Sequence, residues 1–225
     1  MPSRHYPAPA ASASTSLTDT VAETIRQQLI HGQLRAGQRL SEAQLAEQLD
    51  ISRNTLREVF RTLIKEGLLH HEPNRGVSVV VPTIADIIDI YRVRRLIEGQ
   101  ALAQAWPRHP AHKRMQQAMT QAYQARDAGD WLAVGSANMA FHAGIVALAD
   151  SERLSAMFSD ISAELRLAFG LLDDPEFLHA PYVDQNAQLL ELFEAGQTQT
   201  AAQALENYLI QSERMVLSVY ARRLE

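Results

Sequence analysis

Apolar residues recur at helical spacing near the start of the chain. Val21, Ile25 and Leu29 are four residues apart, so they share one face of a helix predicted over residues 17–31. Thr18 is a suitable N-cap for that helix, because its hydroxyl can accept a hydrogen bond from a backbone N–H of the first turn. We therefore expect the regular structure to begin with an amphipathic helix.

Two shorter helices are expected before residue 67. Residues 41–44 (SEAQ) form a capping-box pattern that opens the first of them. Ser52 is a good N-cap for the second, which we expect to continue to about Glu66 and to end at Gly67. The tight turn between the two helices is typical of a helix-turn-helix.

The hydrophobic pattern changes from a helical to a strand period after Gly67. Residues 68–71 and 77–81 are strand candidates, and the turn-rich segment between them contains proline, asparagine and glycine. Three helices followed by a two-stranded hairpin predict a winged helix-turn-helix over residues 17–81.

Beyond Pro82 the pattern contains only helical segments, so the predicted fold class is mainly α. We expect helices at about residues 84–105, 111–128, 131–148, 152–171, 181–195 and 199–222. The domains expected are a disordered tail (1–16), the winged helix-turn-helix (17–81) and an all-α helical bundle (82–225).

Composition narrows the class of protein. The chain has no cysteine, which excludes disulfides and thiolate metal sites. No apolar run is long enough to span a bilayer, and the tail lacks the apolar core of a signal peptide, so we expect a soluble, cytoplasmic protein without membrane contact. The net charge is −5, but residues 1–81 carry +1 and residues 82–225 carry −6, so the acidic excess lies in the bundle.

Cations recur every fourth residue in the third predicted helix, at Arg53, Arg57, Arg61 and Lys65. This spacing places them on one stripe of the helix surface, where Arg can reach guanine edges and other cations can meet phosphates. Such a stripe also occurs on ordinary solvated helices. The surrounding helix-turn-helix and wing favour the DNA-binding interpretation.

Residues 32–80 resemble the DNA-binding domain of the GntR family. The resemblance is carried by the segments LRAG (34–37), LSE (40–42), SR (52–53), LRE (56–58), EGL (66–68) and RG (75–76). It implies DNA contacts by residues of the loop, the third helix and the wing tip, which enters a minor groove. The residues concerned are Arg35, Ser52, Arg53, Asn54, Thr55, Arg57, Arg75 and Gly76.

The second part, roughly residues 84–222, resembles the FCD domain of the FadR subfamily. The matching segments are YRVRRLIE (91–98), FHAGI (141–145) and the last two helices, and six predicted helices suggest the VanR-like branch. The resemblance implies an acidic effector anchored by a divalent metal, which one carboxylate and three histidines hold in many members.

Carried over onto this chain, that ligand set is largely replaced. The carboxylate position is Asn138 and two histidine positions are Asn186 and Tyr208, so only His142 remains. Asn amides and a protonated phenol are weak ligands for Zn or Ni, so we predict no bound metal and no other cofactor. If the family's histidine positions fall one helical turn away from Asn186 and Tyr208, a metal site becomes the alternative.

The replacing residues are polar, so they can form a site of a different kind. We expect Asn138, His142, Asn186 and Tyr208 to line a pocket in which Arg94 supplies positive charge for a small carboxylate metabolite. The alternative is that these groups pair with one another inside a packed bundle.

These patterns predict a sequence-specific transcription regulator that binds an inverted-repeat operator as a homodimer. We expect repression that the effector relieves, with activation as the alternative. Two other classes remain open, a ligand-independent architectural DNA-binding protein and an enzyme. The chain contains no catalytic pair or cofactor motif that favours an enzyme.

Overall fold

The computed structural model describes residues 16–224 apart from residues 107 and 173. The expected disordered tail lies almost wholly outside these residues. The first part of the chain forms α1 (Leu17–Ile30), β1 (Arg39–Leu40), α2 (Glu42–Gln48), α3 (Arg53–Lys65), β2 (Leu69–Glu72) and β3 (Gly76–Val79).

Each of these three helices begins at a serine cap. Ser16, and not Thr18 as predicted, caps α1: its hydroxyl accepts from the Asp19 N–H at 3.1 Å, and the Asp19 carboxylate accepts from the Ser16 N–H. This reciprocal pair satisfies two backbone donors, which a cap at Thr18 would not do. The caps predicted at Ser41 and Ser52 are confirmed.

The wing is a three-stranded antiparallel sheet in the order β1-β3-β2. The hairpin pairs Leu69 with Val79, and β1 adds a third strand by pairing Arg39 with Ser78. The sequence predicted only the hairpin, because a two-residue strand has no alternation to detect. Gly76 has φ +84°, a conformation that favours glycine at the turn.

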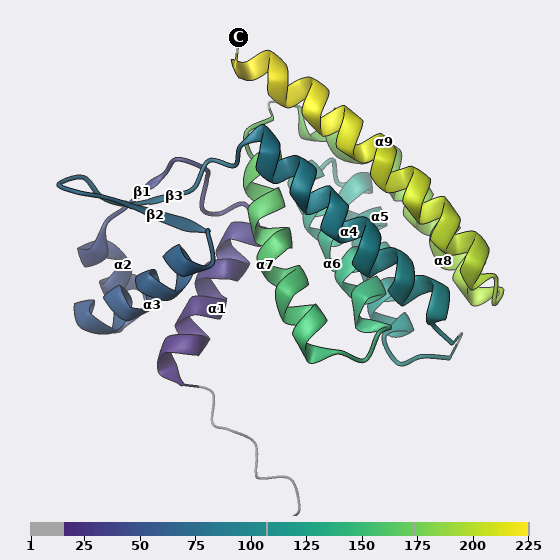
Figure 1. The fold of residues 1–225 in the computed structure, drawn as a ribbon, viewed down its shortest axis with the longest axis horizontal. Helices are drawn as coiled ribbons and strands as arrows, with labels where there is room; N and C mark the ends of the chain where they lie inside the picture. The colour runs from purple at the N-terminus through teal and green to yellow at the C-terminus, as the bar shows by residue number, and fades with distance from the viewer. Residues whose placement is uncertain (1–15, 107, 173, 225) are drawn as a thin grey trace, which may run out of the picture.

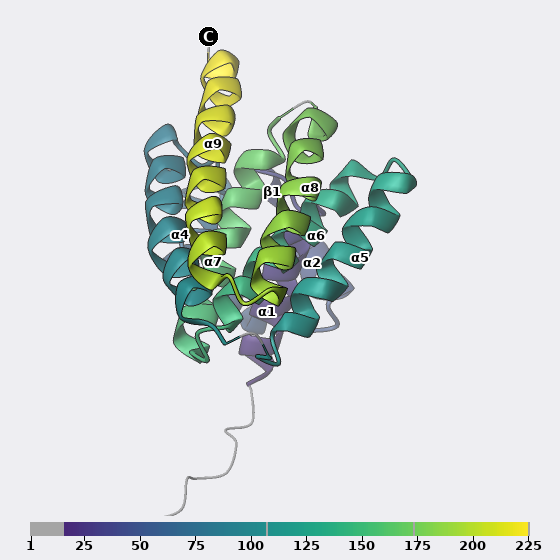
Figure 2. The ribbon, with the colours of Figure 1, turned by 90° about the vertical axis from the view of Figure 1, so that its right-hand side faces the viewer.

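The described residues after Pro82 contain six helices, which is the number predicted. They are α4 (Ile84–Gln104), α5 (His112–Asp127), α6 (Trp131–Ala147), α7 (Glu152–Phe169), α8 (Pro175–Glu194) and α9 (Thr198–Leu224). Helix α9 lies along α4 at one edge of the bundle, and α5 packs against α6 (Figures 1 and 2).

Helix α8 begins six residues earlier than predicted. Asp174 caps it by accepting from the Phe177 N–H at 2.9 Å, and Pro175 occupies the first turn, where proline is tolerated. Pro181 therefore lies inside the helix and does not start it. The preceding turn buries Leu178 and His179, and this packing offsets the hydrogen bond that Pro181 cannot donate.

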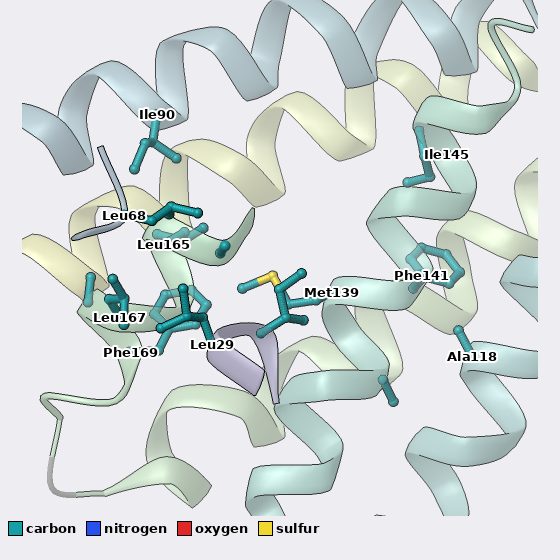
Figure 3. Packing of buried hydrophobic residues seen from close by; sticks show 14 of the residues in the cluster. Leu29, Leu68, Ile90, Ala118, Met139, Phe141, Ile145, Leu165, Leu167 and Phe169 are labelled. Atoms are coloured by element: carbon teal, nitrogen blue, oxygen red, sulfur yellow. The ribbon is translucent and has the colours of Figure 1, made fainter. Parts of the chain in front are cut away.

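The winged helix-turn-helix, called the reading head below, shares one hydrophobic core with the bundle. Helix α1 lies between α3 and α7 (Figure 1). Leu29 of α1 belongs to the same buried cluster as Met139 of α6 and Phe169 of α7, and Leu68 belongs to it as well (Figure 3). Among the described residues, no helix combines the length and the apolar character that a membrane-spanning segment needs.

Candidate DNA-reading surface and polar core of the bundle

Helix α3 buries one face and exposes cations on the other. Leu56, Val59 and Leu63 are buried, whereas Arg53 and Asn54 are exposed at its N-terminal end. This division follows from the apolar period of the helix, because the residues between the buried positions must face solvent. The exposed N-terminal end is the part that enters a major groove in helix-turn-helix proteins.

Three of the predicted contact residues, Ser52, Thr55 and Arg57, also hold helix α3 in place. The Ser52 hydroxyl accepts from the Thr55 N–H at 3.1 Å, and the two hydroxyl oxygens are 2.8 Å apart. Arg57 Nε donates to Glu42 Oε2 at 2.9 Å, which joins α3 to α2. Arg57, which the sequence predicts to contact DNA, therefore also holds the two helices of the motif together.

Arg35 and the wing lie on connected segments. The Gly37 N–H donates to the Val79 carbonyl at 3.0 Å, so the turn that carries Arg35 is tied to β3. An open groove along the wing is lined by Arg75 and Gly76 and also by Arg39, a cation that the sequence analysis missed. Arg39 lies on β1 and pairs with Ser78 of β3, and a strand of two residues leaves no alternating pattern in the sequence.

The bundle contains a polar cluster from three helices, α6, α8 and α9, in which the structure brings together four predicted residues. His142, Asn186 and Tyr208 are buried and Asn138 is half-buried. Asn186 Nδ2 donates to Asn138 Oδ1 at 2.7 Å, and the Tyr208 hydroxyl lies 3.0 Å from the same oxygen. His142 Nε2 is 2.9 Å from the Tyr208 hydroxyl. These groups are thus hydrogen-bonded to one another.

Glu98 of α4 connects this cluster to Arg94. Its Oε2 lies 2.5 Å from His142 Nδ1, and its Oε1 accepts from Arg94 Nε at 2.7 Å. All three side chains are buried. Sequence reasoning selected Arg94 and missed Glu98, although their spacing of four residues on one helix could have indicated the pair.

The charges in this core are set by burial and by mutual contact. Burial would raise the pKa of Glu98, but Arg94 and His142 hold it below its ordinary value, so the carboxylate is ionised. Burial lowers the pKa of His142, as does Arg94, although Glu98 opposes the shift. Burial raises the pKa of Tyr208 well above that of free tyrosine, so its phenol keeps its proton.

The protonation state of His142 determines the direction of these hydrogen bonds. The Tyr208 hydroxyl has one proton and two neighbouring acceptors, His142 Nε2 and Asn138 Oδ1. When His142 is neutral and donates through Nδ1 to Glu98, Nε2 must accept from Tyr208. When His142 is doubly protonated, Nε2 donates instead, and the Tyr208 proton turns to Asn138.

Two buried polar atoms of the core have no hydrogen-bond partner among the described residues. They are Arg94 NH2 and Asn186 Oδ1, one a donor and the other an acceptor. Buried polar groups in native proteins are nearly always paired with protein, water or ligand. The core therefore offers hydrogen bonds that its own side chains do not use.

The donor set does not fit a transition metal. Around His142 Nε2 stand a protonated phenol and two neutral amides, and Glu98 contacts the opposite ring nitrogen. Within the described part of the chain, no group of three or more His, Cys, Asp or Glu side chains is arranged to hold a metal ion. Zn or Ni would need anionic or imidazole ligands that these positions lack.

A winged helix-turn-helix joined to an all-helical bundle with this polar core defines a DNA-binding transcription regulator. The chain belongs to the family described as bacterial regulatory proteins of the gntR family, whose model matches residues 17–79, and it carries an FCD domain at residues 89–211. The members to which it is similar are transcription regulators and not enzymes.

Two similar proteins match over most of the chain and a third matches over about a third of it. A crystal structure of a GntR regulator from Rhodococcus sp. RHA1 is 37% identical, with a TM-score of 0.84, covering 90% of this chain and 98% of that one. The "Probable D-xylose utilization operon transcriptional repressor" of Paenarthrobacter nicotinovorans is 25% identical over 87% of this chain and 86% of its own length. The match to the regulator YdhC of Bacillus subtilis (33% identical) spans only 35% of each chain.

Proposed function

We propose that the protein is a homodimeric repressor that binds an inverted-repeat operator and releases it when a small carboxylate metabolite enters the bundle. The DNA-binding part is supported by the N-terminal end of α3, where Arg53 and Asn54 are exposed to solvent. A two-fold dimer presents two such helices to two half-sites.

Helices α4 and α9 provide a surface suited to the dimer contact. Leu96 of α4 is 72% exposed, which is unusual for a leucine in the middle of a long helix. It borders a shallow groove between α4 and α9 in which Gly99 and Ala202 allow close approach, and Arg92 and Glu206 carry opposite charges. A self-complementary contact needs such an apolar centre with a polar rim.

The observation that carries the effector proposal is the buried, unpaired NH2 of Arg94. A carboxylate that accepts from NH2 would complete the guanidinium, whose Nε is already bonded to Glu98. A hydroxyl of the same metabolite could donate to the free Asn186 Oδ1. To enter, the metabolite must separate some of the contacts among Asn138, His142 and Tyr208.

The charge of the core indicates how an anion is accommodated. With His142 neutral, Arg94 and Glu98 cancel, so the core has no net charge to attract a carboxylate. A proton on His142 adds one positive charge and turns Tyr208 toward Asn138. Binding of a carboxylate should therefore take up a proton at His142, and its affinity should rise as the pH falls.

A route from this core to the DNA-binding head runs along α9. Tyr208 belongs to the polar cluster, and Tyr220, further along the same helix, donates to the carbonyl of Pro82. Pro82 lies between the wing and α4, so a shift of α9 moves the point where the reading head is attached. Coupling of this kind is reciprocal, and operator DNA should weaken effector binding by the same factor.

The proposal is tested by operator binding with a panel of small carboxylates, after the operator has been found by selection from random duplexes. One carboxylate should raise the melting temperature and weaken operator binding in wild type. Arg94→Lys should keep operator affinity and lose that response, because a lysine cannot bond Glu98 and the metabolite in the same geometry. Tight operator binding that no carboxylate changes would favour the ligand-independent regulator.

A further inference from the structure

A cavity lies at the junction of the reading head and the bundle. It has a volume of about 210 Å³ and is lined by α1 on one side and by α5, α6 and α7 on the other. It is separate from the Arg94 cluster, with which it shares no lining residue. Met139 extends from α6 toward α1 at this junction (Figure 3).

The wall of this cavity is mainly apolar. Ile30, Met139, Val146 and Phe158 are buried there, and the alanines of α6 keep one side open. An engineered apolar cavity of roughly 150 Å³ is large enough to hold benzene. The junction cavity is therefore large enough for one ring with a small substituent.

The lining also contains seven polar residues, and two of them, Ser162 and Arg114, are the best suited to contact a bound anion. The full set is Gln27, His31, Arg114, Ser136, Ser155, Ser159 and Ser162. Ser162 is 6% exposed and its hydroxyl has no hydrogen-bond partner in the described structure, so it is an unused donor and acceptor on the wall. Arg114 of α5 is exposed at the rim and forms no ion pair with any described residue. One buried hydroxyl and one free cation suit a ligand that is apolar at its centre and anionic at one end.

We propose that the junction cavity binds a single-ring carboxylate or an anion of similar size and shape. Its ring packs among Ile30, Met139 and Phe158, its carboxylate faces Arg114, and a polar ring substituent reaches the Ser162 hydroxyl. This site is additional to the effector site of the bundle core and does not depend on it.

Occupancy of this cavity acts on the reading helix through α1. Arg26 of α1 donates through Nε and NH2 to the two oxygens of Glu66 at 3.0 and 2.8 Å, and Glu66 is the C-cap of α3. Arg26 also lies 3.3 Å from Asp160 of α7, so one side chain joins the reading helix to the bundle. A ligand wedged between α1 and α7 fixes their spacing and with it the position of α3.

The test uses benzoate as the probe and the methyl groups of methionine as reporters. Full-length protein labelled with carbon-13 at the methionine methyls is titrated with benzoate to 10 mM and followed by NMR. The Met139 methyl signal should shift and saturate, because ring currents act over only a few ångströms, whereas Met215 of α9 should be unaffected. Benzyl alcohol should bind more weakly, since it lacks the charge that faces Arg114.

Matched variants localise the binding. Ala143→Phe fills the cavity from α6 and should abolish the Met139 shift, whereas Ala156→Phe, at an exposed alanine of α7 outside the lining, should leave it unchanged. Tyr208→Phe alters the bundle core and should also leave it unchanged. The proposal is overturned if benzoate does not shift Met139 in wild type, if Ala143→Phe still binds, or if Tyr208→Phe abolishes the shift, which would assign the binding to the core.

Discussion

Glu98 of α4 and His142 of α6 face each other across the centre of the bundle, with 2.5 Å between Oε2 and Nδ1 and no exposed surface on either side chain. The same carboxylate holds Arg94. The carboxylate is therefore the only charge that compensates the guanidinium in this core, and it also orients the imidazole. The effector proposal depends on this arrangement, because it sets both the charge and the unused donor.

Removal of the Glu98 charge should destabilise the fold strongly. Glu98→Gln leaves Arg94 buried without a counter-ion, and breaking such a pair costs about 3–5 kcal/mol. Urea unfolding followed by circular dichroism measures the loss. Glu72→Gln is the control, because Glu72 pairs with the exposed Arg75 on the wing and its loss should change stability by less than about 1 kcal/mol. Equal losses in both variants would contradict the account of the core.

His179 should make the stability depend on pH. Burial and then the neighbouring Arg166 lower its pKa from 6.5 to about 3 in the folded protein. Between these pH values the unfolded chain binds a proton at His179 that the folded chain does not. The stability that neutral His179 contributes is therefore fully present above pH 6.5 and is lost as the pH falls toward 3. The slope contributed is at most about 1.4 kcal/mol per pH unit.

Comparison of variants isolates that slope. His179→Gln should flatten the dependence of unfolding free energy on pH between 6.5 and 4, measured by urea titration at several pH values. His70→Gln, at an exposed position on β2, should leave the slope of wild type. If His179→Gln had the same slope as wild type, the imidazole would not be buried in its neutral form.

Loss of one reading-helix cation should weaken operator binding. Arg53→Ala removes an exposed guanidinium from the N-terminal end of α3 and should cost about 1–3 kcal/mol in fluorescence anisotropy at physiological salt. Arg153→Ala, on the surface of α7, serves as the charge-matched control and should bind as wild type does. Unchanged affinity in Arg53→Ala would refute the assignment of the reading helix.

A charge at the proposed dimer surface should separate the subunits. Leu96→Glu places two carboxylates against each other across a two-fold axis, and light scattering after size exclusion should show the mass of a monomer. Leu132→Glu also replaces an exposed leucine, on α6, and should remain dimeric. A dimer in Leu96→Glu would move the interface away from α4.

Features set by local pattern could be predicted from the sequence. The faces of α3 follow from the spacing of Leu56, Val59 and Leu63, and the caps at Ser41 and Ser52 follow from side-chain chemistry next to an apolar run. The six helices of the bundle could also be predicted, because proline, glycine and aspartate residues mark the breaks between them.

Features that depend on distant partners could not be predicted. Strand β1 exists because Arg39 and Leu40 pair with a strand almost 40 residues later. Glu98 is buried because His142 lies opposite it; its spacing from Arg94 indicates an ion pair on α4, but not that this pair lies in the core. Helix α8 continues through Pro181 because burial of the neighbouring turn outweighs the local rule.

Native mass spectrometry of the protein with its operator duplex, prepared without chelators, tests whether a metal-free dimer binds the operator and releases it to an effector. We expect two chains per duplex with no mass of a divalent metal, and loss of the duplex when the active carboxylate is added. A complex with one divalent metal per chain would contradict this expectation, because Asn138, Asn186 and Tyr208 could not then occupy the ligand positions. One chain per duplex would equally contradict the two-fold dimer on which operator recognition rests.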